Sequence, residues 1–241
     1  MAKFFITFGG PTPSAYNDAV SRICKQAIQC NFFDKIIAYS DIDLQNDDFF
    51  WKTHGQFITE NKRGYGYWLW KPYIIKKTLA LLNDGDYLMY LDCGCEINSK
   101  YKHHLDDYLK IIDSKLIIST AACSNDVIYT KKDLVHFLHM ENDIQLLYSS
   151  HIQAGTVFMK KCDIIVKLYE EYFNVCGNYH LLDDSPSIEQ NNCDFVEHRH
   201  DQSVFNLLVK RYNLKNDDLD LFSVLRTQQN ISNKSTLEDI D

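Results

Sequence analysis

NDGDYLMYLDCGCEIN, residues 83–98, contains the clearest buried strand of the chain. Its first four residues favour a turn, and Tyr87–Leu91 is an unbroken apolar run that stops at the carboxylate of Asp92. Ligands of open α/β sheets bind just outside the carboxyl ends of strands, so Asp92 is a candidate site residue. The small residues Cys93, Gly94 and Cys95 would let a ligand or a metal approach the backbone. Alternatively, Asp92 only ends the strand as a turn or helix N-cap residue.

The composition predicts one folded domain with a sizeable core. The chain has 241 residues, of which 45% are hydrophobic and 24% charged, as in ordinary globular proteins. The net charge of −8 argues against a nucleic-acid partner or an anionic-membrane surface. Because no apolar run reaches about 18 residues and MAKFFITFGG is too short for a signal peptide, we expect a cytoplasmic protein without an integral membrane segment.

The cysteines fit the same compartment. There are 8 of them, with no CxxC pair and no zinc-ligand spacing. Reduced, largely buried thiols are therefore the expectation.

The order of the elements predicts a parallel sheet. A strand at 3–8, ending at Phe8 and followed by Gly9 and Gly10, precedes a helix within 14–33 and a strand within 34–43. The two glycines would let backbone amides approach a nucleotide, or they form a plain turn. Residues 47–61 are expected to form a variable loop or a short helix. Further strands are predicted at 116–121 and 156–159, and further helices at 103–112, 131–138 and 162–175.

RGYGYWLWKPYIIKKTLALL, residues 63–82, places cations before a helix that begins near Pro72. Lys71 would lie at the positive end of this helix, where a lysine gains nothing from the helix dipole. A bound diphosphate would explain both Lys71 and Arg63. In the alternative interpretation, Trp68 and Trp70 are core residues and the cations are solvated.

The segment FVEHRHDQSVFNLLVKR, residues 195–211, forms a second candidate centre. Asp201 is predicted to be the N-cap of a helix, with His198 and His200 just before it. Capping explains Asp201 but not the two histidines, so we expect a functional role for the cluster. Gly155, before another strand, would admit a ligand or mark a β-bulge. Beyond residue 225 the polar tail is expected to be loosely ordered.

Together these segments resemble glycosyltransferases of the GT-A fold. The blocks RGYGYWLWKP (63–72), GDYLMYLDCGCEIN (85–98), QAGTVFMKK (153–161) and EHRHDQSVFNLL (197–208) resemble proteins from bacterial capsule or lipopolysaccharide clusters and from large DNA viruses. More distantly, their order resembles family-8 and family-32 glycosyltransferases. The resemblance covers residues 3 to about 225 and implies a single α/β domain with a Rossmann-like mixed sheet flanked by helices, followed by a polar tail at 226–241. It also implies polysaccharide biosynthesis in a bacterial or viral-host cytosol.

The resemblance implies a UDP- or GDP-linked nucleotide-sugar donor, a glycan acceptor and a divalent metal, Mn²⁺ or Mg²⁺. Asp92 takes the place of the first aspartate of the Asp-x-Asp motif, but the second aspartate is Gly94 here. The other metal ligand would then come from Glu96, His198 or His200, or the metal is weakly held or absent. The donor-binding residues implied are Phe8, Gly9, Arg63, Lys71, Asp92, Cys93, Gly94, Gln153, Ala154, Gly155 and Gln202.

Two aspartates are candidates for catalysis. Asp201 would deprotonate the acceptor hydroxyl or stabilise a cationic sugar, and Asp183 or Asp184 is the alternative base. Two other functions stay open. One is a metal-dependent hydrolase or nuclease that uses Asp92, His198, His200 and Asp201, and the other is a non-catalytic module that binds a nucleotide sugar.

Overall fold

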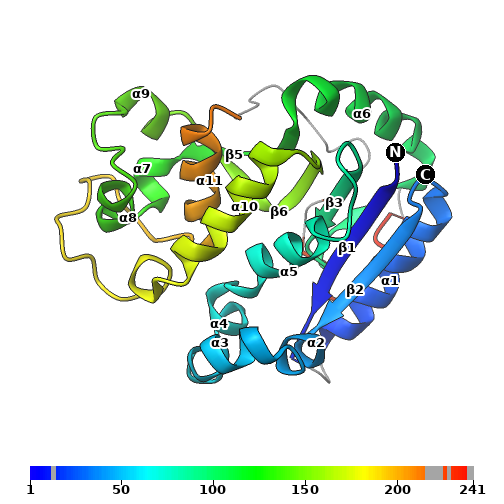
Figure 1. The fold of residues 1–241 in the computed structure, drawn as a ribbon, viewed down its shortest axis with the longest axis horizontal. Coiled ribbons are helices and arrows are strands. Elements are labelled where there is room, and N and C mark those ends of the chain that lie inside the picture. The colour runs from blue at the N-terminus through cyan, green and yellow to red at the C-terminus, as the bar shows by residue number, and fades with distance from the viewer. Residues whose placement is uncertain (12–14, 215–224, 227–228, 238–241) are drawn as a thin grey trace.

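The structure is a computed structural model that describes residues 1–11, 15–214, 225–226 and 229–237 (Figure 1). Its centre is a five-stranded sheet with the order β2-β1-β3-β6-β5. The strands are β1 (Lys3–Gly9), β2 (Lys35–Ser40), β3 (Tyr87–Leu91), β5 (Ile117–Asn125) and β6 (Ser150–Lys160). β1 is parallel to β2 and β3, whereas β6 is antiparallel to β3 and β5. A small second sheet pairs β4 (Glu96–Ile97) with β7 (Leu225–Arg226).

β3 lies in the middle of the sheet and is buried on both faces. All five of its residues are buried, and alternate side chains enter two different core clusters. Leu88 and Tyr90 pack on one face, and Tyr87, Met89 and Leu91 pack on the other. An unbroken apolar run is what a doubly covered strand requires, which is why the sequence predicts β3 so clearly.

Helices cover both faces of this sheet (Figure 1). α1 (Ala15–Cys30) and α6 (His103–Lys115) contribute to one core cluster. α3 (Asp48–Glu60), α5 (Trp70–Leu79), α10 (Asp163–Cys176) and α11 (Asp201–Arg211) contribute to the other. The shorter helical segments are α2 (Asp41–Gln45), α4 (Gly64–Tyr67), α7 (Asp126–Tyr129), α8 (Lys132–Phe137), α9 (Ile144–Leu147), η1 (Ser99–Tyr101) and η2 (Tyr179–Leu181).

The architecture confirms the predicted single α/β domain with a mixed sheet between helices. The expectation of a variable loop or short helix at 47–61 is wrong, because α3 is a full helix. Asp47 caps it by accepting a hydrogen bond from the Phe50 amide at 3.1 Å. The buried face of α3 includes His54 and Gly55 beside Phe50 and Ile58, so its apolar periodicity is faint.

Two predicted boundaries also change. β6 begins at Ser150, so Gln153 to Gly155 lie inside the strand and not before it. The prediction of a loosely ordered tail is wrong for residues 229–237, which bond to α1 and to β4. The predicted tail residues 227–228 and 238–241 lie outside the described residues.

In the described ranges, we find no helix with the length and apolarity needed to cross a bilayer.

Candidate functional site

A cavity of about 590 Å³ opens at the carboxyl ends of β1 and β3. Its wall comes from the loop after β1, the segment 62–71, the residues just after β3 and the start of α11. Asp92 and Asp201 both line it. These two aspartates, distant in the sequence, therefore share one cavity. The cavity lies at the carboxyl ends of strands, where α/β sheets usually bind ligands.

The backbone and two neighbours hold Asp92 in place. Its amide donates to the Gly155 carbonyl at 2.8 Å, and the Tyr90 hydroxyl donates to its Oδ1 at 2.5 Å. Gly155 lies against the carboxylate, because a Cβ at this position would be 2.4 Å from Asp92 Oδ2. The glycine of the predicted donor-binding block thus makes space for Asp92, and it does not itself line the cavity.

Lys71 joins the two aspartates. It is the second residue of α5, and its Nζ lies 3.4 Å from Asp92 Oδ1 and 3.1 Å from Asp201 Oδ2. The side chain is only 5% exposed. Burial alone would lower the pKa of the Lys71 ammonium, but Asp201 and Asp92 hold it above its ordinary value. The lysine at the start of this helix is therefore balanced by two carboxylates of the chain itself.

Asp201 is the most deeply buried acid of the cavity wall. Its side chain is 4% exposed, compared with 27% for Asp92. Burial raises the pKa of Asp201 above its ordinary value, although Lys71 and a hydrogen bond from the Tyr172 hydroxyl oppose this rise. The N-cap prediction is wrong, because α11 begins with Asp201 and its cap position is His200. Asp201 instead directs its carboxylate toward Lys71 and Tyr172.

The two predicted histidine ligands have different partners, although their ring centroids lie 5.7 Å apart. His198 is buried, donates to the Leu181 carbonyl through Nε2 at 2.9 Å and accepts from the Lys131 amide at Nδ1. Burial lowers the pKa of His198 to about 3, so the ring stays neutral. His200 does line the cavity, but its Nδ1 donates to the Leu182 carbonyl and its ring lies against Tyr67 and Trp68.

The residues as arranged do not fit the predicted metal. Across the ranges that the structure describes, no three His, Cys, Asp or Glu side chains converge as ligands. Glu96, another sequence candidate, is buried away from the cavity and accepts hydrogen bonds from Gln26 and from the C-terminal residues Asn230, Ser235 and Thr236. Mn²⁺ or Mg²⁺ binding stays a prediction.

The predicted base Asp184 pairs with a lining residue of the cavity, Arg63. Arg63 Nη1 contacts both of its carboxylate oxygens at 3.0 Å, and the pair is about half exposed. Arg63 lines the cavity, whereas Asp184 is not part of its lining. Asp183 turns toward Lys131 and Ser185 instead. Arg63 therefore reaches the cavity while already paired.

The cavity wall at α4 has an unusual backbone. Gly64, Tyr65, Gly66, Tyr67 and Trp68 all have positive φ, which makes a left-handed turn. Each of the three aromatic residues costs roughly 1 kcal/mol or more in this conformation. A side chain at Gly64 would lie 2.4 Å from the Trp68 ring. The sequence shows the alternating glycines, but their left-handed geometry was not predicted.

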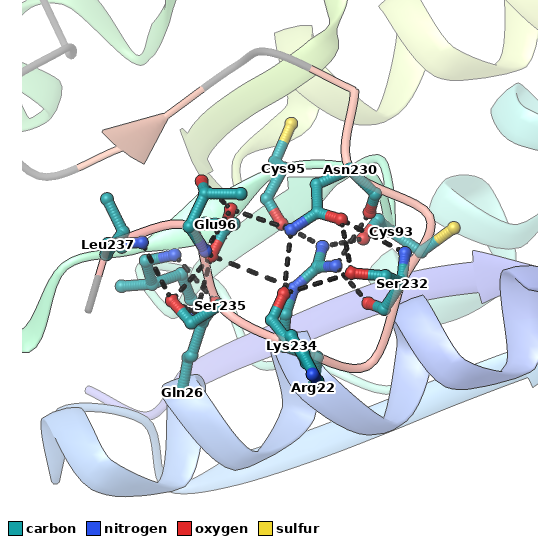
Figure 2. A network of polar contacts seen from close by, with 12 residues as sticks. Arg22, Gln26, Cys93, Cys95, Glu96, Asn230, Ser232, Lys234, Ser235 and Leu237 are labelled. Atoms are coloured by element: carbon teal, nitrogen blue, oxygen red, sulfur yellow. Dashed lines mark hydrogen bonds and ion pairs between the residues drawn. The ribbon is translucent and has the colours of Figure 1, made fainter. Parts of the chain in front are cut away.

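The C-terminal segment 229–237 contributes a residue to the cavity wall, which the sequence did not predict. Figure 2 shows how it is held: Arg22, from α1, donates to the carbonyls of Asn230 and Cys93, and Asn230 donates to Glu96. This segment brings Gln229 to the cavity. A Cβ added at Gly94 would be 2.0 Å from Gln229 Oε1, so Gln229 fills the space beside Gly94.

The other predicted residues divide between lining and support. Phe8, Cys93, Gly94 and Gln202 line the cavity. Gly9 packs on α1, since a Cβ there would lie 2.5 Å from Val20. Gln153 and Ala154 lie in β6, where the Ala154 amide donates to Gln202 Oε1 at 3.3 Å and ties β6 to α11. Gly10, whose backbone the sequence predicts to approach a nucleotide, also lines the cavity. The lining residues that the sequence did not identify as site residues are Pro11, Tyr16, Lys62, Gly64, Tyr65, Trp68, Trp70, Glu197, Arg199 and Gln229. Aromatic and basic residues near a strand end were the available signal.

No protein-family model matches the chain, and no curated protein matches it. Among solved structures, the chain is similar to a glycosyltransferase involved in the glycosylation of the major capsid of PBCV-1, with 9% identity over 73% of this chain and a TM-score of 0.43. That match spans 66% of the viral protein, just under two thirds of its length. The chain is also similar to mouse xyloside xylosyltransferase 1, with 11% identity over 91% of this chain and 84% of that one and a TM-score of 0.46.

Proposed function

We propose that the protein transfers a sugar from a UDP- or GDP-linked donor to a hydroxyl group of a glycan or other acceptor. The observation that carries this proposal is the convergence of Asp92, Lys71 and Asp201 on one cavity at the ends of β1 and β3. Cleavage of a sugar–phosphate bond needs positive charge near the leaving diphosphate and negative charge near the cationic sugar. The site offers both charges within one wall.

The lining supports a nucleotide-sugar ligand. A volume of about 590 Å³ lies in the usual range for a small-molecule site. Tyr65 and Trp68 offer aromatic surfaces on which a base or a sugar can stack. Lys62, Arg63 and Arg199 add cations that suit phosphate oxygens. These charged side chains favour a ligand that carries phosphate groups over an apolar small molecule.

The burial of the two candidate acids suggests different roles. Asp201 is deep and paired with Lys71, so we assign it to stabilise the positive charge that develops on the sugar. Asp184 is about half exposed and pairs with the lining residue Arg63, so we assign it to the acceptor side. These roles belong to the proposal and are separable by mutation.

The competing hydrolase function receives less support from the geometry. It requires His198, His200, Asp201 and Asp92 to act together on one metal. His198 is buried beside Lys131 and Leu181, with both ring nitrogens hydrogen-bonded to backbone groups. The transferase proposal needs neither ring nitrogen of His198.

A thermal-shift screen of UDP- and GDP-sugars tests the proposal. A donor is expected to raise Tm, because binding to the folded state stabilises it by mass action. Asp92→Asn should change that shift, because Asp92 lines the cavity and pairs with Lys71, and Asp84→Asn, at the exposed turn before β3, is the matched control that should keep it. Release of the nucleoside diphosphate that requires an added acceptor would support transfer. Stabilisation without any turnover would favour a binding module, and hydrolysis without an acceptor would favour a hydrolase.

A further inference from the structure

The position between the two site carboxylates already holds a cation. Lys71 Nζ lies within 3.4 Å of Asp92 Oδ1 and within 3.1 Å of Asp201 Oδ2. Lys71 is buried and belongs to α5, whose packing against α10 fixes the position of the ammonium. A divalent ion bound by both carboxylates would have to displace this ammonium. The Lys71 ammonium therefore competes with a metal ion for the position between the two carboxylates.

A second, independent observation concerns the residue two positions after Asp92. Gly94 has no side chain, and the space that its Cβ would occupy is within 2.0 Å of Gln229 Oε1. Gln229 belongs to the C-terminal segment. The backbone amide of the next residue, Asn230, donates a hydrogen bond to the Gly94 carbonyl at 2.9 Å. A neutral amide thus fills the space in which a second carboxylate would be needed to hold a metal.

The cavity carries cations without any added ion. Its lining contains four cationic side chains, Lys62, Arg63, Lys71 and Arg199, and three acidic ones, Asp92, Glu197 and Asp201, and Asp184 pairs with Arg63 from outside the lining, so the charges balance. Lys71 has three N–H donors, and its ion pairs within the described residues use two of them. The cavity that Lys71 lines is where its third donor would meet a ligand.

We propose that this site works without a divalent metal and that Lys71 supplies the charge that a metal would otherwise bring to the leaving diphosphate. The inference rests on the proposed function and makes it more specific. As the bond between the anomeric carbon and the phosphate oxygen breaks, the electron pair goes to the diphosphate, and Lys71 stabilises the added negative charge. The new bond forms to the acceptor oxygen, whose proton leaves to a base or to water.

The first test uses UDP and GDP as probes on protein stripped of metals. Isothermal titration is carried out in EDTA and again with MnCl₂. We expect one of the two diphosphates to bind equally well in both conditions. Lys71→Met should weaken it about 10- to 100-fold, the loss expected for a charge-assisted hydrogen bond. Lys76→Met, on the same helix but outside the cavity lining, should leave binding unchanged.

The outcomes separate this inference from the proposed function. Binding that needs Mn²⁺ overturns the metal-free site and leaves sugar transfer standing. Absence of UDP and GDP binding in both conditions overturns both. Equal binding with and without EDTA supports both.

The second test needs no nucleotide. Mn²⁺ should leave Tm of the wild-type protein unchanged, because the Lys71 ammonium already lies between Asp92 and Asp201. Lys71→Met removes that cation, so its lowered Tm should rise when Mn²⁺ is added, whereas Lys71→Arg, which keeps the charge, should show no such rescue. A rise of the wild-type Tm with Mn²⁺ contradicts the inference, and this comparison holds even if Lys71→Met does not fold.

Discussion

Asp92 depends on two residues that take no part in the proposed chemistry. Tyr90 donates a hydrogen bond to its carboxylate, and Gly155 leaves room for it. The carboxylate is therefore held from one side by a hydroxyl and from the other by the backbone of β6. Its exposed fraction of 27% faces the cavity that it lines.

Gly155→Ala should displace Asp92. The new methyl group would lie 2.4 Å from Asp92 Oδ2, too close for any contact, so the carboxylate or β6 must move. We expect the free energy of unfolding to fall by about 1–3 kcal/mol, as for other overpacked interiors, and donor binding to be lost. Urea denaturation and isothermal titration measure the two effects. Gly177→Ala, at a helix end with φ −69°, is the control; equal effects at both positions would contradict the account.

Tyr172 and Tyr169 form a matched pair for testing the support of Asp201. Both are fully buried on α10, but Tyr172 donates to Asp201, whereas no described residue bonds the Tyr169 hydroxyl. Tyr172→Phe should cost about 1–2 kcal/mol of unfolding free energy, because a buried acid loses a donor. Tyr169→Phe should be neutral or stabilising. Chemical denaturation that ranks the two variants in the opposite order would argue against this role.

The site residues were predictable singly but not as a group. Asp92 ends an apolar run, Lys71 precedes a proline, and Asp201 starts an apolar helix, and each of these patterns is local. The ion pairs of Lys71 with Asp92 and Asp201 join residues that are distant in the sequence. The apolar periodicity of a single helix or strand does not predict such contacts. From the sequence, Lys71 and Arg63 suggested a bound diphosphate. In the structure, Asp92 and Asp201 pair with Lys71, and Asp184 pairs with Arg63. The positions of the two cations therefore do not by themselves require a diphosphate.

At the scale of elements, two irregular segments shape the cavity. The left-handed turn of α4 presents Tyr65 and Trp68, and the segment 229–237 presents Gln229. The regular elements were predicted well because their apolar patterns match the periods of buried strands and amphipathic helices. The polar composition of 229–237 predicted disorder, but buried Arg22 and Glu96 supply the polar partners that hold it (Figure 2).

Arg22→Ala should release the segment 229–237. Arg22 donates to backbone carbonyls of Cys93, Cys95 and Asn230, and its loss leaves the buried Glu96 without its ion-pair partner. Breaking a buried pair in this way costs about 3 kcal/mol or more. Hydrogen exchange should show faster exchange of the amides at 229–237 and at 93–96. Lys25→Ala, on the exposed side of α1, should change neither, and protected amides in the Arg22 variant would contradict the assignment.

At the scale of the whole molecule, buried ionisable groups set the acid stability. Burial lowers the pKa of His198 from 6.5 to about 3, so the unfolded chain takes up its proton first and stability falls as the pH drops below about 6.5. Burial opposes the charged form of Glu96, but hydrogen bonds from Thr236, Asn230, Ser235 and Gln26 lower its pKa from 4.5 to about 2. Its contribution is present above pH 4.5 and is lost as the pH falls toward 2.

Urea denaturation across pH 2 to 7 should therefore show two stages of destabilisation. Glu96→Gln should reduce the lower stage, by an amount of order 2 kcal/mol, and keep the one that begins near pH 6.5. Glu60→Gln, at the end of α3, should keep both stages. An unchanged profile in Glu96→Gln would show that the C-terminal segment does not bind a charged Glu96.

The most direct measurement is a crystal structure of the protein grown with saturating UDP or GDP in the presence of EDTA. We expect a diphosphate in the cavity between α4 and the start of α11, with an oxygen within hydrogen-bond distance of Lys71 Nζ. A nucleotide bound on another face of the molecule, or an empty cavity at saturating concentration, would contradict this expectation.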